Sequence, residues 1–154
     1  MSLTARWRRP RRARRADVGQ GFVALEAPAL QATIRSVFVA GEGGGPLAAE
    51  LSFAPGADGR VVAVWRNRNV GFVPEPHAAV IRRQLDEPGP GRLVADGRVY
   101  DDGTWWRVWV GPDPAGGFPV PDDAYDELAP PIPSIFGFAL GESLGRPPAG
   151  RSRN

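Results

Sequence analysis

Three residues with side chains suited to binding alternate along one short stretch of the chain, Trp105, Arg107 and Trp109. Alternate residues of an extended strand point to the same face of a sheet. Two indole rings on either side of a guanidinium group would form a surface on which nucleic-acid bases or another protein can stack. The alternative is that the apolar residues 132–140 cover both rings, because exposed pairs of tryptophans are uncommon on monomeric proteins. The sequence favours burial and leaves both interpretations open.

Side chains that commonly perform catalysis or bind metals are sparse. The chain has one histidine, His77, no cysteine and no GxSxG motif, so it lacks the partners of a catalytic triad and the ligands of a zinc site. The acidic pairs at positions 101–102 and 122–123 are adjacent in expected turns, where two carboxylates rarely face one substrate. The glycine cluster 41–45 is not a P-loop, because that motif requires a lysine and the chain has none. We therefore expect a protein that is not an enzyme and that uses no metal and no cofactor.

Arginine is concentrated at the two ends of the chain. The 154 residues carry a net charge of +2, but the first sixteen contain seven arginines and no acidic residue. Residues 17–145 contain nine arginines and all seventeen acidic residues, a net charge of −8. Residues 1–20 also lack a hydrophobic period, which predicts a disordered, Arg-rich arm. That arm is either a solvated tail or a segment that binds nucleic-acid phosphates.

The bulk properties indicate one domain with a modest core. The absence of cysteine fits a reducing compartment. No apolar run is long enough to cross a bilayer or to form the hydrophobic region of a signal peptide. We expect a cytoplasmic protein with no membrane partner.

The central stretch predicts a strand, a tight turn, a second strand and a helix. Residues 61–65 are apolar on both alternating faces, as in a strand that is covered on both sides. The polar residues 66–69 suit a hairpin turn, and residues 70–73 resume as a strand whose Gly71 indicates a bulge or a close backbone approach. Two prolines then precede residues 77–85, which fit one amphipathic helix. Its apolar side would carry Val80, Ile81 and Leu85.

The flanking sequence adds further strands of one small β-barrel. Alternating apolar residues predict strands over residues 30–40 and 47–53, and a hairpin formed by residues 93–100 and 104–110. The barrel, of about six strands and one helix, would occupy residues 21–111. We expect a Pro- and Asp-rich connector over 112–131, an apolar segment over 132–145 and a tail over 146–154. The expected core comprises Val64, Trp65, Val73, Ile81, Leu85, Trp106 and Val108.

The run VVAVW, the hairpin and VGFVPEPHAAVIRRQL together resemble the centre of a HIRAN domain. That family typically has Asn-Pro-Tyr-Asp-x-Asn-Ala-Val-x-Val, a short hairpin, then Gly-Tyr-Leu-Pro and a helix. The resemblance covers roughly residues 30–111. It implies a small SH3- or OB-like β-barrel. Domains of this family are often attached to DNA-remodelling helicases. Some members of the family bind single-stranded DNA at its free 3′-hydroxyl end.

The resemblance also implies a set of site residues. Asp58 matches the family aspartate that accepts a hydrogen bond from a terminal hydroxyl, while Ala57 stands where the family has the stacking Tyr, and Arg60 replaces the Asn after it. Arg35 corresponds to an arginine near the start of the family domain, and Trp105 lies near an aromatic of its last hairpin. Together with the arginines of the expected turn and the phenylalanine after Gly71, the candidate nucleic-acid-binding residues are Arg35, Asp58, Arg60, Arg66, Arg68, Phe72 and Trp105.

Two functions follow as expectations. The first is a non-catalytic HIRAN-like module that binds nucleic acid, with single-stranded DNA or DNA ends as the expected ligand. The alternative is a protein–protein interaction module on the same fold that has lost its DNA site, with residues 132–140 as the surface for its protein partner.

Overall fold

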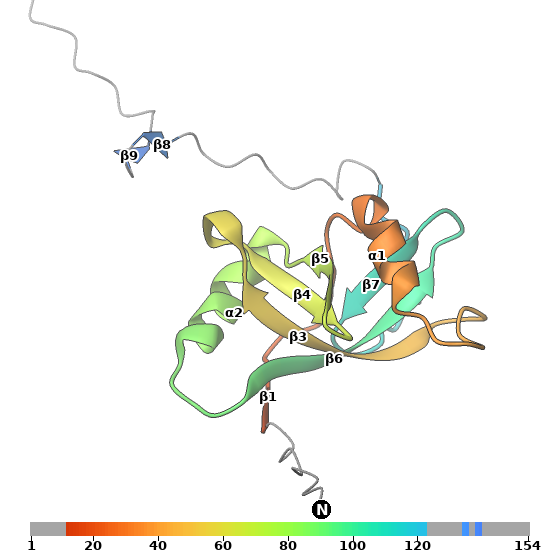
Figure 1. Ribbon diagram of the computed structural model, residues 1–154, viewed down its shortest axis with the longest axis horizontal. Helices are drawn as coiled ribbons and strands as arrows, with labels where there is room; N and C mark the ends of the chain where they lie inside the picture. Colours follow the sequence, from red (N-terminus) through yellow and green to blue (C-terminus); the bar gives the residue numbers. More distant parts are fainter. Residues whose placement is uncertain (1–11, 123–133, 136–137, 140–154) are drawn as a thin grey trace, which may run out of the picture.

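The computed structural model describes residues 12–122, 134–135 and 138–139 (Figure 1). Its elements in chain order are β1 (Ala13–Arg15), β2 (Phe22–Val23), the 3₁₀ turn η1 (Pro28–Leu30), α1 (Gln31–Ser36), β3 (Leu47–Pro55), the 3₁₀ turn η2 (Ala57–Gly59), β4 (Val61–Trp65), β5 (Arg68–Phe72), α2 (Glu75–Asp86), β6 (Arg92–Asp101), β7 (Trp106–Val110), β8 (Ser134–Ile135) and β9 (Phe138–Ala139).

Most of these strands form one curled sheet in the order β2-β7-β6-β3-β4-β5, with antiparallel neighbours throughout. The chain just after β2 reaches the opposite edge of that sheet. There Leu25 and Phe72 exchange two backbone hydrogen bonds, of 2.8 and 3.1 Å. The sheet therefore curls until its two edges meet at one bridge. This confirms a mostly β fold with a curled, barrel-like sheet.

The core lies on the concave side of the sheet and is closed by two helices. α2 packs against β3 and β4, and α1 packs against β5 (Figure 1). Of the expected core residues, Trp65, Val73, Ile81 and Val108 are buried in one cluster, and Leu85 and Trp106 pack against it as partly buried residues. Val64 is only half-buried, because it faces the outer side of β4.

The predicted hairpin is confirmed, with a shorter turn than expected. Arg66 and Asn67 both have positive φ, 48° and 64°, as the two-residue type I′ turn requires. Arg68 therefore already belongs to β5 and pairs with Trp65. Gly71 serves both of the purposes proposed for it, because the β4–β5 register shifts nearby and a Cβ there would lie 2.6 Å from the Cβ of Ala24.

The strand predicted over residues 30–40 is wrong, and with it the count of one helix. Residues 28–36 form η1 and α1, because the buried positions Gln31 and Ile34 are three apart, which is a helical rather than a strand period. The Gln31 side chain fixes this helix to β7. Its amide oxygen accepts a hydrogen bond from the backbone N–H of Trp106 at 2.9 Å, and its amide nitrogen donates to the backbone carbonyl of Trp106 at 2.8 Å.

The disordered arm predicted for residues 1–20 is wrong for residues 12–20, while residues 1–11 lie outside the described part of the chain. Residues 13–15 form β1, which adds in parallel to β6. The Arg14 side chain donates to the Gln84 carbonyl, and Arg15 pairs with Asp96 at 2.8 Å. Backbone pairing and ion pairs order this segment, and neither leaves a hydrophobic period in the sequence.

The connector and the C-terminal segment are described only in part. Residues 112–122 follow β7 and return along its outer side, as shown by the Tyr100 hydroxyl, which donates to the Pro119 carbonyl at 2.8 Å. β8 and β9 pair with each other in a separate two-stranded ladder. The expectation that residues 132–140 cover the tryptophans falls largely outside the described residues and stays a prediction. Among the described helices, none has the length and apolar character needed to cross a membrane.

Replacing Ile81 by Ala tests the position of α2. Ile81 is 1% exposed in the main core, so Ile81→Ala is expected to lower the free energy of unfolding by about 2 to 5 kcal/mol. Val80, the next residue, is 38% exposed and provides the matched control. Val80→Ala should change stability by less than about 0.5 kcal/mol. Chemical denaturation of both variants checks this, and equal losses would contradict the assigned helix face.

Candidate functional site

Trp109, in β7, is not free for stacking, whereas Trp105 lies half-buried just before β7. Trp109 is 8% exposed and packs with Val23, Tyr100 and Phe118 in a small second cluster. Its indole N–H donates to the Pro112 carbonyl at 2.8 Å. Trp109 is therefore buried, and the cover described here comes from Pro112 and Phe118 of the connector and not from residues 132–140, whose expected contact with the tryptophans stays a prediction.

The arginine of the ladder belongs to a buried ion pair. The Arg107 Nε donates to the Asp102 carboxylate at 2.5 Å, and the two side chains are 2% and 1% exposed. Burial raises the pKa of Asp102. The N–H groups of Trp105 and Thr104 and the guanidinium of Arg107 outweigh that effect, so that the pKa lies below the ordinary value of 3.8. The pair fixes the β6–β7 turn and leaves no charge for a ligand.

Four of the seven candidate residues gather around α1. Arg35 is exposed on that helix, and Arg66 and Arg68 are exposed on the β4–β5 hairpin, whose second strand packs against α1. The Arg66 Nη1 donates to the carbonyl of Val37, the C-cap residue of α1, at 2.7 Å. Trp105 is half-buried next to Trp106, whose backbone is bonded to the start of the same helix.

Arg66 is the most firmly positioned of the four. Its guanidinium lies over the Trp65 ring, 4.4 Å from the ring centroid. Both terminal nitrogens donate to the two oxygens of Glu42, each at 2.6 Å. These bonds and the Val39 N–H lower the pKa of Glu42 to about 2. This is the bidentate geometry in which a guanidinium binds an oxyanion, and here the oxyanion is a carboxylate from the same chain.

A polar groove of about 410 Å³ runs beside Arg66 on the outer face of β3 and β4. Two arginines, an amide and a hydroxyl contribute to its walls, groups that hydrogen-bond phosphate and sugar oxygens. One carboxylate, that of Glu50, opposes them. The lining residues are Ala48, Glu50, Ser52, Val64, Trp65, Arg66, Asn67 and Arg92.

The other three candidates lie at the opposite end of the same strands. Asp58 is exposed in η2 with φ of 56°, and Arg60 follows it just before the Val61–Pro55 pair. Phe72 pairs with Val62 in the sheet and also forms the closing bridge, so its place is set by the fold. At the Arg66 end, by contrast, Trp65 pairs with Arg68. The seven candidates therefore form two groups and not one site.

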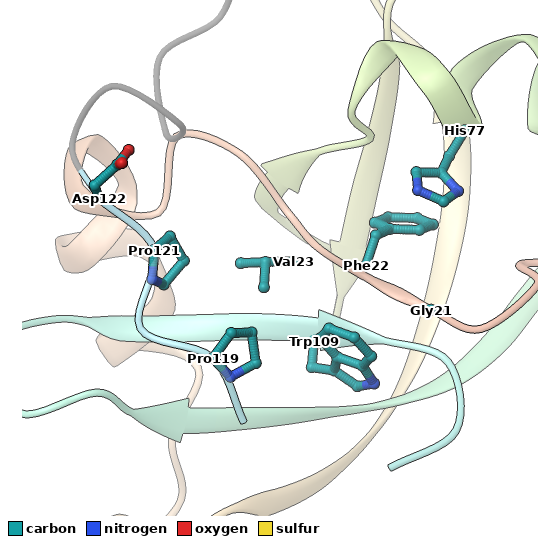
Figure 2. Close-up of a pocket in the computed structure, with 8 residues that line it drawn as sticks. All are labelled: Gly21, Phe22, Val23, His77, Trp109, Pro119, Pro121 and Asp122. Carbon is teal, nitrogen blue, oxygen red and sulfur yellow. The ribbon is translucent and has the colours of Figure 1, made fainter. Parts of the chain in front are cut away.

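A second concavity, not expected from the sequence, lies between β2, the start of α2 and residues 119–122 (Figure 2). Its volume is about 410 Å³. Figure 2 shows Phe22 and His77 at one end, stacked with their centroids 4.5 Å apart, and Asp122 at the other. Trp109 and Pro119 line the middle. We call this the aromatic cleft; its lining residues are Gly21, Phe22, Val23, His77, Trp109, Pro119, Pro121 and Asp122.

The aromatic cleft could not be anticipated because it joins segments far apart in the chain. Phe22 comes from residues 21–29, for which no strand was predicted, and Pro119 from the region expected to be a connector. The lone histidine was the one local signal, and its expected place at a helix start is correct. Within the part of the chain that the structure describes, no group of three or more His, Asp or Glu could hold a metal ion.

Comparison with known proteins adds no relative. No family model, no curated protein and no solved structure matches the chain.

Replacing Asp102 by Asn tests the buried ion pair. Asp102→Asn removes the carboxylate that pairs with the buried Arg107 cation, and is expected to cost about 3 to 5 kcal/mol of stability. A second change, Arg107→Met, should recover much of that loss, because the double variant buries no uncompensated charge. Denaturation of the two single variants and the double variant checks this, and a double variant no more stable than Asp102→Asn would argue against the pair.

The same carboxylate gives an expected pH dependence. The folded-state pKa of Asp102 is below 3.8, so its contribution to stability is fully present above pH 3.8 and is lost as the pH falls toward the folded-state pKa. Melting temperatures measured below pH 3.8 should therefore fall less steeply with pH for the Asp102→Asn/Arg107→Met variant than for the unaltered protein.

Proposed function

We propose that this chain is a non-catalytic, HIRAN-like binding module on a small SH3- or OB-like barrel, and that its ligand is nucleic acid, single-stranded DNA first. The observation that supports this most is the set of contacts that the Arg66 guanidinium makes with Trp65 and Glu42. A guanidinium held flat on an indole ring and bound at both nitrogens by a carboxylate is arranged to bind a phosphate in the same manner.

The surroundings of Arg66 extend this receptor into a surface. Arg35 and Arg68 are exposed on either side of the α1–β5 contact, and Asn67 and Arg92 line the adjoining groove. Contacts of this kind hold a nucleic-acid backbone without reading its sequence. We call Arg35, Arg66, Arg68 and Arg92, with Asn67, the arginine surface.

The charge of the folded part is compatible with such a surface. Residues 12–122 contain twelve arginines and thirteen acidic residues, a net charge of −1. The strongly negative value of the longer span 17–145 arises because it omits Arg12, Arg14 and Arg15 and includes four acidic residues beyond position 122. Binding would therefore depend on the local grouping of arginines and not on net charge.

The arrangement favours binding along a backbone over capture of a DNA end. Asp58, the residue that matches the end-binding aspartate of the HIRAN family, lies at the far end of β4 from Arg66. Ala57 beside it has no ring to stack on a terminal base.

A titration with a fluorescein-labelled oligothymidine at several salt concentrations tests the proposal. Arg68→Ala and Arg35→Ala should each weaken binding and reduce the slope of log K against log salt by about 0.7, the value for one contact to a single strand. Arg83→Ala is the matched control, since Arg83 is an exposed arginine on α2 that does not belong to the arginine surface. No binding at low salt, or an equal effect of the control, would overturn the proposal.

The N-terminal arm supplies an independent test. Residues 1–11 contain Arg6, Arg8, Arg9 and Arg11, whereas the later arginines 14 and 15 are engaged with Gln84 and Asp96. Deletion of residues 1–11 spares β1 and should flatten the salt dependence by about 0.7 for each phosphate that the arm contacts. An unchanged slope, with an unchanged melting temperature, would leave the arm as a solvated tail.

The aromatic cleft favours the alternative function, a protein–protein interaction module. An apolar groove with rings and prolines on its walls suits an apolar side chain of a peptide. This function becomes the better account of the fold if the oligothymidine titration shows no binding.

A further inference from the structure

Glu42 lies in the glycine-rich loop between α1 and β3. Glycines occupy positions 41, 43, 44 and 45, and Gly41 and Gly43 have positive φ of 88° and 112°. A Cβ added at Gly41, Gly44 or Gly45 would meet no atom within 4 Å. The loop is thus built from residues with unusual backbone freedom and projects from the packed part of the protein. Its one charged side chain is nevertheless directed back onto the arginine surface.

The carboxylate of Glu42 is held there by three donors. Two are the terminal nitrogens of Arg66, and the third is the backbone N–H of Val39, at 2.9 Å. The Glu42 side chain is 20% exposed and that of Arg66 36% exposed, so water reaches the pair. An ion pair in such a position contributes little net stability, because solvent and salt screen it. The bonds can therefore be exchanged for others of the same kind.

We propose that Glu42 is an intramolecular competitor for the phosphate subsite at Arg66, displaced when nucleic acid binds. This inference rests on the proposed function. The carboxylate occupies both donors of the guanidinium fork, so a phosphate cannot engage them until Glu42 leaves. The glycines on either side allow that movement without moving α1 or β3, the two elements that the loop joins.

The competition would set which anions bind. A single phosphate must replace two good hydrogen bonds at Arg66 and gains only those two in return. A strand with consecutive phosphates also contacts Arg35 and Arg68, and those additional contacts offset the displacement of Glu42. The surface would therefore discriminate against isolated phosphates and favour polymers.

Glu42→Gln tests this, because it removes the charge and keeps the shape of the side chain. Affinity for labelled oligothymidine should rise roughly two- to fivefold, the range expected from loss of one exposed competing ion pair. The slope of log K against log salt should steepen by about 0.7, because Arg66 then releases its counterion on binding. Asp86→Asn, at an exposed acid on α2, is the control for the same change in net charge.

A double-variant cycle separates competition from a general effect on the loop. In an Arg66→Gln background, Glu42→Gln should have no effect on affinity or on the salt slope. The inference would be overturned if Glu42→Gln still raised the affinity in the absence of Arg66, or if Asp86→Asn raised the affinity equally. The inference would also be overturned if Glu42→Gln left the affinity unchanged while Arg68→Ala lowered it. In that case the proposed function would still stand. Absence of binding by every variant would instead remove the proposed function itself.

Discussion

The fold depends on residues 22–25, which pair with both edges of the sheet. β2 pairs with β7 through Phe22 and Val23, and Leu25 pairs with Phe72 at the other edge. Four residues thus satisfy backbone groups on two strands that are otherwise the open ends of the sheet. The arginine surface and the aromatic cleft both follow from this closure. It places β5 where α1 can pack on it, and it places Phe22 against His77 at the start of α2.

Local patterns predicted the parts of the fold in which neighbours in sequence are neighbours in space. The alternation in residues 47–53 and 106–110, the two-strand hairpin and the Pro-initiated helix all depend on contacts within a few residues. β1 and β2 could not be predicted in this way, because strands of three and two residues show no period. Their pairing partners also lie far away in the chain, 79 residues from β1 in β6 and 86 to 88 residues from β2 in β7. α1 was missed because two buried positions, Gln31 and Ile34, are too few to define a helical period.

For the candidate site too, local features could be predicted from the sequence and tertiary contacts could not. Arg66 and Arg68 could be placed from the sequence because a hairpin turn exposes its residues whatever surrounds it. What the sequence could not supply was the partner of each charge. Arg107 and Arg66 both alternate with or adjoin tryptophans, yet one is buried against Asp102 and the other is exposed against Glu42. The difference lies in which loop reaches each guanidinium, and that is a property of tertiary structure.

The backbone conformation of Arg66 is energetically unfavourable for an arginine. A φ of 48° at the first position of the type I′ turn suits Asn or Gly, and a long side chain with a Cβ is disfavoured there. Asn67, at the second position, meets the same requirement with a residue that tolerates it. The hairpin therefore folds with less stability than its geometry allows. The same tight turn holds the Arg66 side chain in a fixed position at the end of the β4–β5 hairpin. A search for more stable variants of this protein would select against Arg66 early, and would remove the cation without disturbing the barrel.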